Sequence, residues 1–215
     1  QEPLLSAYGD TSKGIITGDN ARFLKMWHEI PIDEIGFNTT NYIMCEKSDT
    51  KWYPCNKGGE YRKWYGNNTY IIDWWHNGYE VMQKGRTKAR NCQDYADVNK
   101  FVPSVTWSSL SSGAPSFRFS DMSLSESAGM TLFPKTISAD YCLSYLNTKV
   151  ADYFLKVINP TLNYTAGSIS TLPIKKPDCE SEEKIETLSS HSVSISKSDW
   201  DSFETSWDFK RHPLV

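Results

Sequence analysis

The sequence lacks the motifs that mark the commonest catalytic and cofactor-binding folds. Its 215 residues contain no Gly-x-Ser-x-Gly, no Gly-x4-Gly-Lys-Ser/Thr, no Gly-x-Gly-x-x-Gly and no His-Glu-x-x-His. The Asn/Asp-Pro-Pro-Tyr/Phe tetrapeptide of amino-methyltransferases is also absent, since Asn159-Pro160-Thr161 has neither the second proline nor the aromatic residue. We therefore interpret the chain as a binding module with no catalytic residues and no cofactor of its own.

Signals for metal binding, export and membrane insertion are missing too. The five cysteines and four histidines are scattered, with no Cys-x-x-Cys pair, so we predict reduced thiols and no metal site. There is no long apolar run, which excludes a membrane span. The chain begins Gln1-Glu2-Pro3-Leu4-Leu5, which is no signal peptide and has no initiator methionine. We expect a cytoplasmic location and interpret the chain as a fragment or a processed product.

Positive charge is concentrated in one stretch. Residues 51–90 hold eight lysines and arginines against three acids, whereas the whole chain has a net charge of −3. Basic side chains interleaved with aromatic and amide side chains on glycine-containing loops are typical of nucleic-acid-binding surfaces. The alternative is a solvated, lysine-rich loop around a sheet.

The chemistry of the individual side chains gives the candidate DNA-binding residues. Lysines are suited to phosphates, whereas arginine and asparagine can also make paired hydrogen bonds to base edges. The candidates for phosphate contact are Lys57, Lys63, Lys84 and Lys88. The candidates for base reading are Arg62, Asn67, Asn68, Arg86, Arg90 and Arg118, with Tyr65 as a stacking residue.

Periodicity and turn signals predict an α+β fold. Short, mostly antiparallel strands between residues 13 and 133 are expected to form a twisted sheet, with helices packed on one side. The strands are expected at 13–17, 41–46, 51–54, 70–75, 104–108, 116–120 and 129–133. A helix capped by Asp19 is expected at 20–29. A second helical region begins at Ser138, is split near Asn147-Thr148 and ends at Pro160.

The composition changes after Pro177. Residues 178–208 carry nine acids against two lysines, a net charge of −7. We predict two short helices around a serine-rich link, which pack against another part of a larger protein and do not bind DNA. The chain is accordingly divided into residues 1–177 and an acidic helical extension, residues 178–215.

Several blocks along the chain resemble, in the same order, the target-recognition region of the PglX family, the adenine-specific DNA methyltransferases of BREX phage-defence systems. The blocks that carry this resemblance are residues 13–24, 56–68, 106–110, 143–150, 159–164, 172–174 and 196–209. More distantly, the arrangement is similar to specificity domains of other restriction-modification enzymes.

The resemblance implies that residues 1–177 form a DNA target-recognition domain. It also implies an S-adenosylmethionine-dependent catalytic domain before residue 1, which methylates adenine N6, and a helical region after Val215. The expected partners are double-stranded DNA, the catalytic domain of the same parent chain and other BREX proteins, with no membrane. Two other readings are a protein-docking module that uses the acidic tail and, from eight tryptophans and twelve tyrosines, a carbohydrate-binding module.

Overall fold

Two four-stranded sheets form the framework of the protein. The computed structural model describes residues 2–88, 99–121 and 123–214, without the side chains of residues 84–88. The first sheet has the order β1-β8-β5-β6 and is antiparallel throughout. Its strands are β1 (Gly9–Ser12), β5 (Ser104–Ser108), β6 (Phe117–Ser120) and β8 (Gly129–Pro134).

The second sheet has the order β2-β4-β3-β7. Its strands are β2 (Leu24–Met26), β3 (Trp52–Asn56), β4 (Tyr70–Asp73) and β7 (Leu124–Ser125). Only the β3–β7 pair is parallel among its described pairs. The α+β class and the mostly antiparallel pairing are confirmed. The single sheet is not, because the chain leaves the first sheet after β6, adds β7 to the second and returns as β8.

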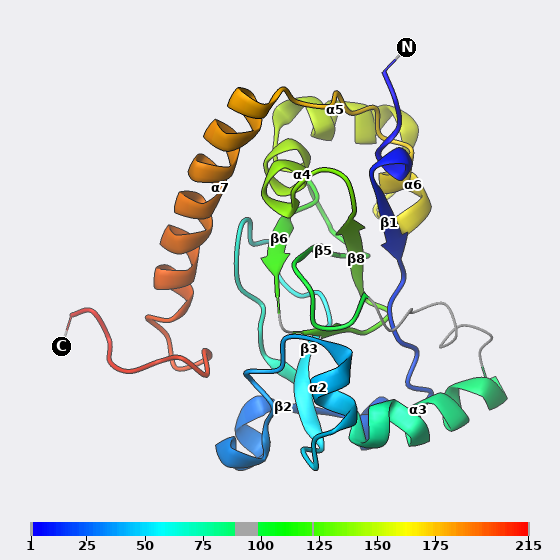
Figure 1. Cartoon of the computed structure of the whole chain (residues 1–215), viewed down its shortest axis with the longest axis vertical. Helices are drawn as coiled ribbons and strands as arrows, with labels where there is room; N and C mark the ends of the chain where they lie inside the picture. The colour runs from blue at the N-terminus through cyan, green and yellow to red at the C-terminus, as the bar shows by residue number, and fades with distance from the viewer. Residues whose placement is uncertain (1, 89–98, 122, 215) are drawn as a thin grey trace.

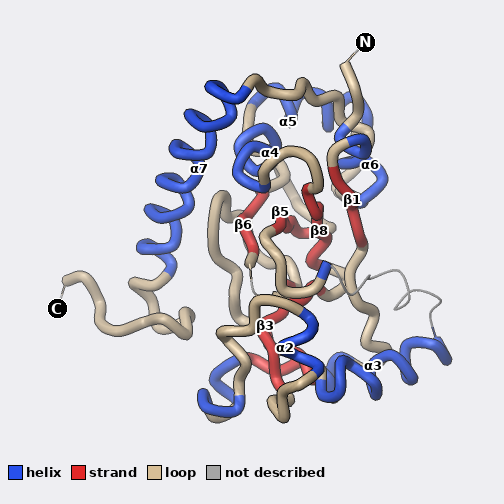
Figure 2. The backbone as a smooth tube through the Cα atoms, viewed as in Figure 1, coloured by secondary structure: helices blue, strands red, loops and turns tan. Residues whose placement is uncertain are grey.

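Helices α4 (Ala139–Leu146), α5 (Lys149–Ile158) and α6 (Ala166–Ser170) gather at the end of the molecule that holds the first sheet, at the top of Figure 1. At the opposite end lie α1 (Asn20–Phe23), α2 (Tyr42–Glu46) and α3 (Trp75–Lys88), with the second sheet. Helix α7 (Cys179–Trp200) runs along one side and packs on α4. Figure 2 shows the strands enclosed between these helices. No helix among the described residues is long and apolar enough to cross a bilayer.

Each sheet has its own apolar core. Trp107, Leu132 and Leu143 belong to a fully buried cluster between the first sheet and the helices beside it. The indole of Trp107 donates a hydrogen bond to the carbonyl of Tyr164 at 2.8 Å, so its one polar atom is satisfied. A second cluster, which includes Tyr53 and Ile72, fills the space around the second sheet and α3.

Several local predictions are confirmed. Strands appear at the ranges predicted as 51–54, 70–75, 104–108, 116–120 and 129–133, with β3 continuing to Asn56 and β8 to Pro134. Ser138 caps α4, since its hydroxyl accepts from the Tyr141 amide at 3.1 Å. The helical region divides at Asn147-Thr148, where Thr148 caps α5.

Other local predictions are wrong. Residues 13–17 contribute only an isolated bridge, at Ile15, in place of a strand. The helix after Asp19 ends at Phe23, because the chain turns into β2 to pair with β4. Residues 42–46 form helix α2, whose first turn is capped by the Asn41 side chain. The acidic segment is one 22-residue helix, α7, and not two short ones.

Candidate nucleic-acid interface

The loop between β3 and β4 carries six of the predicted DNA-binding residues. It leaves the second sheet at Lys57 and crosses to the edge of the first sheet. There the amide of Trp64 donates to the Phe117 carbonyl at 2.9 Å, and the Phe119 amide donates to the Trp64 carbonyl at 2.7 Å. Gly59 has a φ of 134°, and a β-carbon on it would lie 2.9 Å from the Asn67 side chain. The loop therefore connects the two sheets with a folded backbone, and we call it the bridge loop.

The side chain of Arg118 is buried beneath the bridge loop and donates hydrogen bonds to it and to the first sheet. Its side chain is 1% exposed, and its guanidinium donates to Arg62 O, Ser116 O, Ser116 Oγ and Ser108 Oγ at 3.2–3.4 Å. Burial lowers the pKa of Arg118 to about 10. Its guanidinium is enclosed by protein acceptors, so DNA contact by Arg118 stays a prediction that requires the loop to open.

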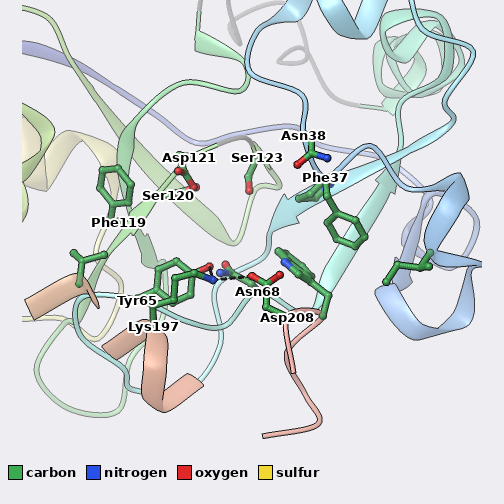
Figure 3. Close-up of a pocket in the computed structure, with 14 residues that line it drawn as sticks. Phe37, Asn38, Tyr65, Asn68, Phe119, Ser120, Asp121, Ser123, Lys197 and Asp208 are labelled. Atoms are coloured by element: carbon green, nitrogen blue, oxygen red, sulfur yellow. Dashed lines mark hydrogen bonds and ion pairs between the residues drawn. The ribbon is translucent and has the colours of Figure 1, made fainter. Parts of the chain in front are cut away.

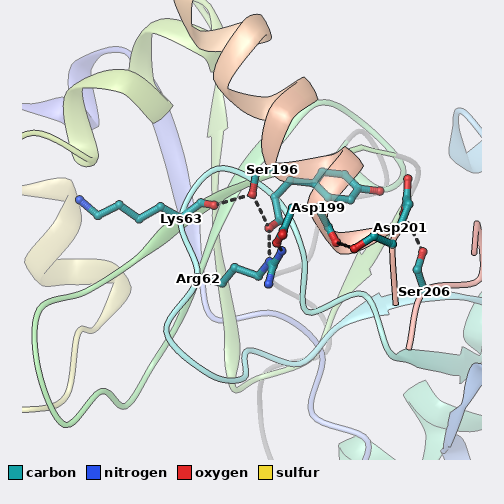
Figure 4. A network of polar contacts seen from close by, with 8 residues as sticks. Arg62, Lys63, Ser196, Asp199, Asp201 and Ser206 are labelled. Atoms are coloured by element: carbon teal, nitrogen blue, oxygen red, sulfur yellow. Dashed lines mark hydrogen bonds and ion pairs between the residues drawn. The ribbon is translucent and has the colours of Figure 1, made fainter. Parts of the chain in front are cut away.

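Helix α7 lies against the outside of the same loop (Figure 4). Asp199 forms an ion pair with Arg62, whose guanidinium also lies 5.2 Å from the Trp200 ring centroid. The Ser196 hydroxyl is shared between the carbonyls of Lys63 and Tyr65, at 3.0 and 3.2 Å. The acidic segment thus packs against this chain itself, at the place predicted to face DNA.

Lys63 and Tyr65 are likewise engaged within the protein. The ammonium of Lys63 donates to the carbonyl of Asn147 at 3.0 Å. The Tyr65 ring lies 5.0 Å from the Lys197 ammonium, and burial raises the pKa of the Tyr65 hydroxyl. DNA contact by these two residues stays a prediction that requires their present partners to be exchanged.

The remaining loop residues are partly exposed. The Lys57 ammonium lies 4.5 Å above the Tyr70 ring centroid. Asn67 donates from its amide to the Glu60 carbonyl at 2.8 Å, and the Asn68 side chain lines a cleft described below. Their contacts with DNA remain predictions as well.

The other predicted basic residues fall on or beyond α3. Positions 84, 86 and 88 lie in the last turns of this helix, and Arg90 lies outside the described residues. Gly85 also lies inside this helix. In the described part of α3, Val81 is buried, whereas Tyr79 is 63% exposed and Gln83 is exposed. Position 86 follows Tyr79 and Gln83 at helical spacing of seven and three residues, on the same stripe.

A cleft of about 450 Å³ opens where the two sheets meet α7 and the C-terminal segment (Figure 3). Its aromatic lining comes from Phe37, Tyr65, Phe119 and Trp207. Its polar lining comes from Asn38, Asn68, Ser120, Asp121, Ser123, Lys197 and Asp208. Of these residues the sequence pattern identified only Tyr65 and Asn68, because the others come from segments far apart in the chain and share no local motif.

The charges in the cleft are arranged around Lys197. Its ammonium donates to Asp201 at 2.8 Å and to Asp208 at 2.7 Å. Burial opposes the charged form, but hydrogen bonds to these two carboxylates outweigh it and raise the pKa of Lys197. Burial also raises the pKa of Asp121 on the opposite wall. The cleft can therefore bind aromatic or hydrogen-bonding groups but does not favour a phosphate.

Within the part of the chain that the structure describes, no group of three or more His, Cys, Asp or Glu side chains is placed to hold a metal ion. The fold and the cleft define the chain as a small α+β module with a polar and aromatic cleft between two sheets.

Sequence comparison identifies the family to which this module belongs. The chain is 34% identical over 210 residues to the adenine-specific methyltransferase PglX of Lacticaseibacillus casei (strain Zhang), covering 94% of this chain and 17% of that protein. It is 33% identical over 208 residues to the adenine-specific methyltransferase BrxX of Escherichia coli O9:H4 (strain HS), covering 94% of this chain and 16% of that protein. No protein-family profile matches the chain. The chain belongs, as a segment, to the PglX family of adenine-specific methyltransferases, and it spans about one sixth of the length of these relatives.

Proposed function

We propose that the chain provides DNA target recognition for an adenine-N6 DNA methyltransferase in BREX phage defence. The support from sequence is its similarity, over nearly its whole length, to two proteins named adenine-specific methyltransferases. In this proposal S-adenosylmethionine and the methyl-transfer groups belong to other parts of such an enzyme, and this chain binds double-stranded DNA in the cytoplasm.

The observation that carries the proposal is the outer face of α3. This helix extends away from the second sheet, at the lower right of Figure 1, and its buried residue Val81 fixes which side faces solvent. An α-helix fits the major groove of B-form DNA, and arginine and glutamine read guanine and adenine there. Tyr79, Gln83 and position 86 lie on one stripe of this helix, so they can reach successive positions in a groove.

The bridge loop has a second role in this proposal. Because Arg118, Ser196 and Asp199 hold its backbone and Arg62, we assign it to positioning the module on DNA, with Lys57 as its phosphate contact. Positions 84 and 88 follow the buried Val81 by three and seven residues and lie on its stripe, away from the outer face, so their phosphate contacts stay predictions. Base reading is thereby assigned mainly to α3, and Arg62 is assigned to the fixed framework.

The test compares α3 variants in a full-length methyltransferase that contains this chain. The cognate site is determined first, by methylome sequencing of cells that express the enzyme with this region intact or swapped. Gln83→Ala and Arg86→Ala should each weaken binding to the cognate duplex by about 1–3 kcal/mol and change binding to a scrambled duplex little, as measured by fluorescence anisotropy. Lys184→Ala, an exposed lysine on α7, is the matched control and should leave both affinities unchanged.

Two outcomes contradict this assignment. Equal losses on both duplexes would show that α3 grips the backbone and reads no bases. If neither duplex lost affinity, α3 would not be part of the DNA interface. In that case a methylation motif that still follows the swapped region would place the reading residues elsewhere in the chain.

The exposed face of α5 favours a second, compatible role in protein docking. Val150, Tyr153 and Val157 recur at helical spacing and are 58–67% exposed. We propose that this face packs on the catalytic domain of the same parent enzyme or on another BREX protein. Tyr153→Asp should then reduce methylation and leave DNA affinity intact, whereas Glu183→Lys on α7 should change neither. Full methylation by the Tyr153→Asp enzyme would exclude the role.

A further inference from the structure

The cleft between the two sheets combines flat apolar walls with unused hydrogen-bonding groups. Tyr65 from the bridge loop and Phe119 from β6 line one side, as Figure 3 shows. Phe37 and Trp207 lie on the other side, with ring centroids 4.9 Å apart. The volume of about 450 Å³ falls within the usual range for small-molecule sites, about 300–1,000 Å³.

Three polar side chains in the cleft are available for hydrogen bonds to a ligand: Asn38 is exposed, and Asn68 and Asp121 are half-buried. The side chains of Asn38, Asn68 and Asp121 make no hydrogen bond to another described residue, although all three line the cavity. An amide can donate and accept, whereas a carboxylate only accepts. A ligand that satisfies all three must therefore offer both donors and acceptors, with at least one N–H donor for Asp121.

The charged residues in the cleft further restrict the classes of ligand that it can bind. Lys197 is paired with Asp201 and Asp208 and forms no ion pair with Asp121, although its charge partly offsets the effect of burial on the pKa of Asp121. Burial favours the protonated carboxyl of Asp121, and a donor that hydrogen bonds to the ionised form would stabilise it. A phosphate or carboxylate ligand would instead meet repulsion from both acidic walls.

We propose that this cleft binds an unpaired nucleobase that carries an exocyclic amino group. Asp121 accepts a hydrogen bond from the amino group, Asn38 and Asn68 bond to the remaining edge, and Tyr65 or Phe119 stacks on the ring. Stacking on aromatic side chains together with hydrogen bonds to the pairing edge is how proteins bind bases outside a duplex. Thymine and uracil have no exocyclic amino group and are the disfavoured bases.

The inference that this base comes from DNA rests on the proposed function, whereas binding of the base itself does not. The same chemistry could be offered by a free nucleoside or by a base extruded from a strand. The two sources are separated by using nucleosides in one arm of the test and oligonucleotides in the other.

In the first arm, the 215-residue chain is titrated by calorimetry with adenosine, cytidine, guanosine and thymidine. At least one amino-bearing nucleoside should bind at least tenfold more tightly than thymidine. Asp121→Asn and Asn68→Ala should each weaken that binding about tenfold or more, whereas Asp33→Asn, an exposed carboxylate outside the cleft, should not. Circular dichroism and Tm show that each variant is folded. Equal binding of thymidine, or unchanged binding by both cleft variants, overturns the inference.

In the second arm, the full-length enzyme is titrated with a perfect duplex and with a duplex that carries one bulged adenine or cytosine. The bulged duplex should bind several-fold more tightly, and Asp121→Asn should abolish that difference. Perfect-duplex binding with no bulge preference in wild type would overturn the DNA source but leave the proposed function standing. Tight nucleoside binding without any duplex binding would contradict the proposed function and leave the base site standing.

Discussion

The Arg62 guanidinium forms an ion pair with Asp199 of α7, a residue 137 positions later in the chain. The sequence pattern assigns Arg62 to DNA because it stands among basic and aromatic neighbours on a glycine-containing loop. The structure uses it to attach the acidic helix to that loop. The two residues differ in exposure, since the Arg62 side chain is 25% exposed and that of Asp199 is 61% exposed.

This difference predicts unequal effects of the two alanine substitutions on stability. Asp199→Ala should lower the free energy of unfolding by less than about 1 kcal/mol, because exposed ion pairs contribute little. Arg62→Ala should cost about 1–3 kcal/mol, because Arg62 also donates from Nε to the Tyr65 carbonyl at 3.1 Å and covers the Trp200 ring. Urea unfolding measures both values. Glu180→Ala, which breaks an exposed pair on the same helix, is the control and should change stability by a few tenths of a kcal/mol.

The carboxyl of Asp121 predicts a pH-dependent effect. Burial raises its pKa above the ordinary value of 3.8, so its contribution to stability is present at low pH and is lost as the pH rises through the folded-state pKa. Asp121→Asn should therefore increase the free energy of unfolding at pH 7, and the gain should disappear as the pH approaches 4. Chemical unfolding from pH 4 to 8 measures this. A gain that is independent of pH would mean that the effect comes from packing and not from charge.

Asn147 ties the junction of α4 and α5 to the first sheet. Its side chain accepts from the Phe117 amide at 3.3 Å and donates to the Phe117 carbonyl at 3.0 Å. Asn147→Ala should cost about 1–3 kcal/mol, because it leaves the Phe117 amide without this partner, whereas the Phe117 carbonyl keeps the hydrogen bond from the Trp64 amide. Asn163→Ala, at an exposed loop position, should stay within about 0.5 kcal/mol. Equal effects of the two substitutions in thermal unfolding would show that the junction is held by packing alone.

Local signals in the sequence were sufficient where a capping residue or a clear alternation decided the structure. Ser138 and Thr148 mark true helix starts, and the alternating residues of 104–108 form β5. Local signals failed where tertiary contacts decided. The serines of 189–196 have low helix propensity and predicted a break, but α7 continues through them because it packs on α4 and the bridge loop.

Local sequence signals were also insufficient to predict the arrangement of the candidate interface and the cleft. Basic and aromatic clustering directed attention to residues 51–90, which include the bridge loop, but no local pattern could pair Arg62 with Asp199 or predict that Arg118 is buried. The cleft was missed for a related reason. Phe37, Asp121 and Lys197 become neighbours only after two sheets and a distant helix are assembled, and none belongs to a motif.

Substitutions of Arg118 and Lys57 can distinguish a residue that positions the bridge loop from a residue that contacts DNA directly. Arg118→Met removes the donor to Arg62 O, Ser116 O, Ser116 Oγ and Ser108 Oγ, so the bridge loop should loosen and the free energy of unfolding should fall by about 1–3 kcal/mol. Affinity for cognate and scrambled duplexes should then fall together, because a loop that positions the module carries no sequence information.

Lys57→Ala should weaken both affinities to a similar degree but leave Tm nearly unchanged, since this ammonium only covers the Tyr70 ring at 4.5 Å. Anisotropy titrations over a salt series, with Tm measured on the same samples, give both readouts. Lys57→Ala should also reduce the slope of log affinity against log salt concentration by about 1, whereas Arg118→Met should not if its guanidinium stays buried in the complex. A reduced salt slope for Arg118→Met would show that the loop opens on DNA and brings this arginine to a phosphate.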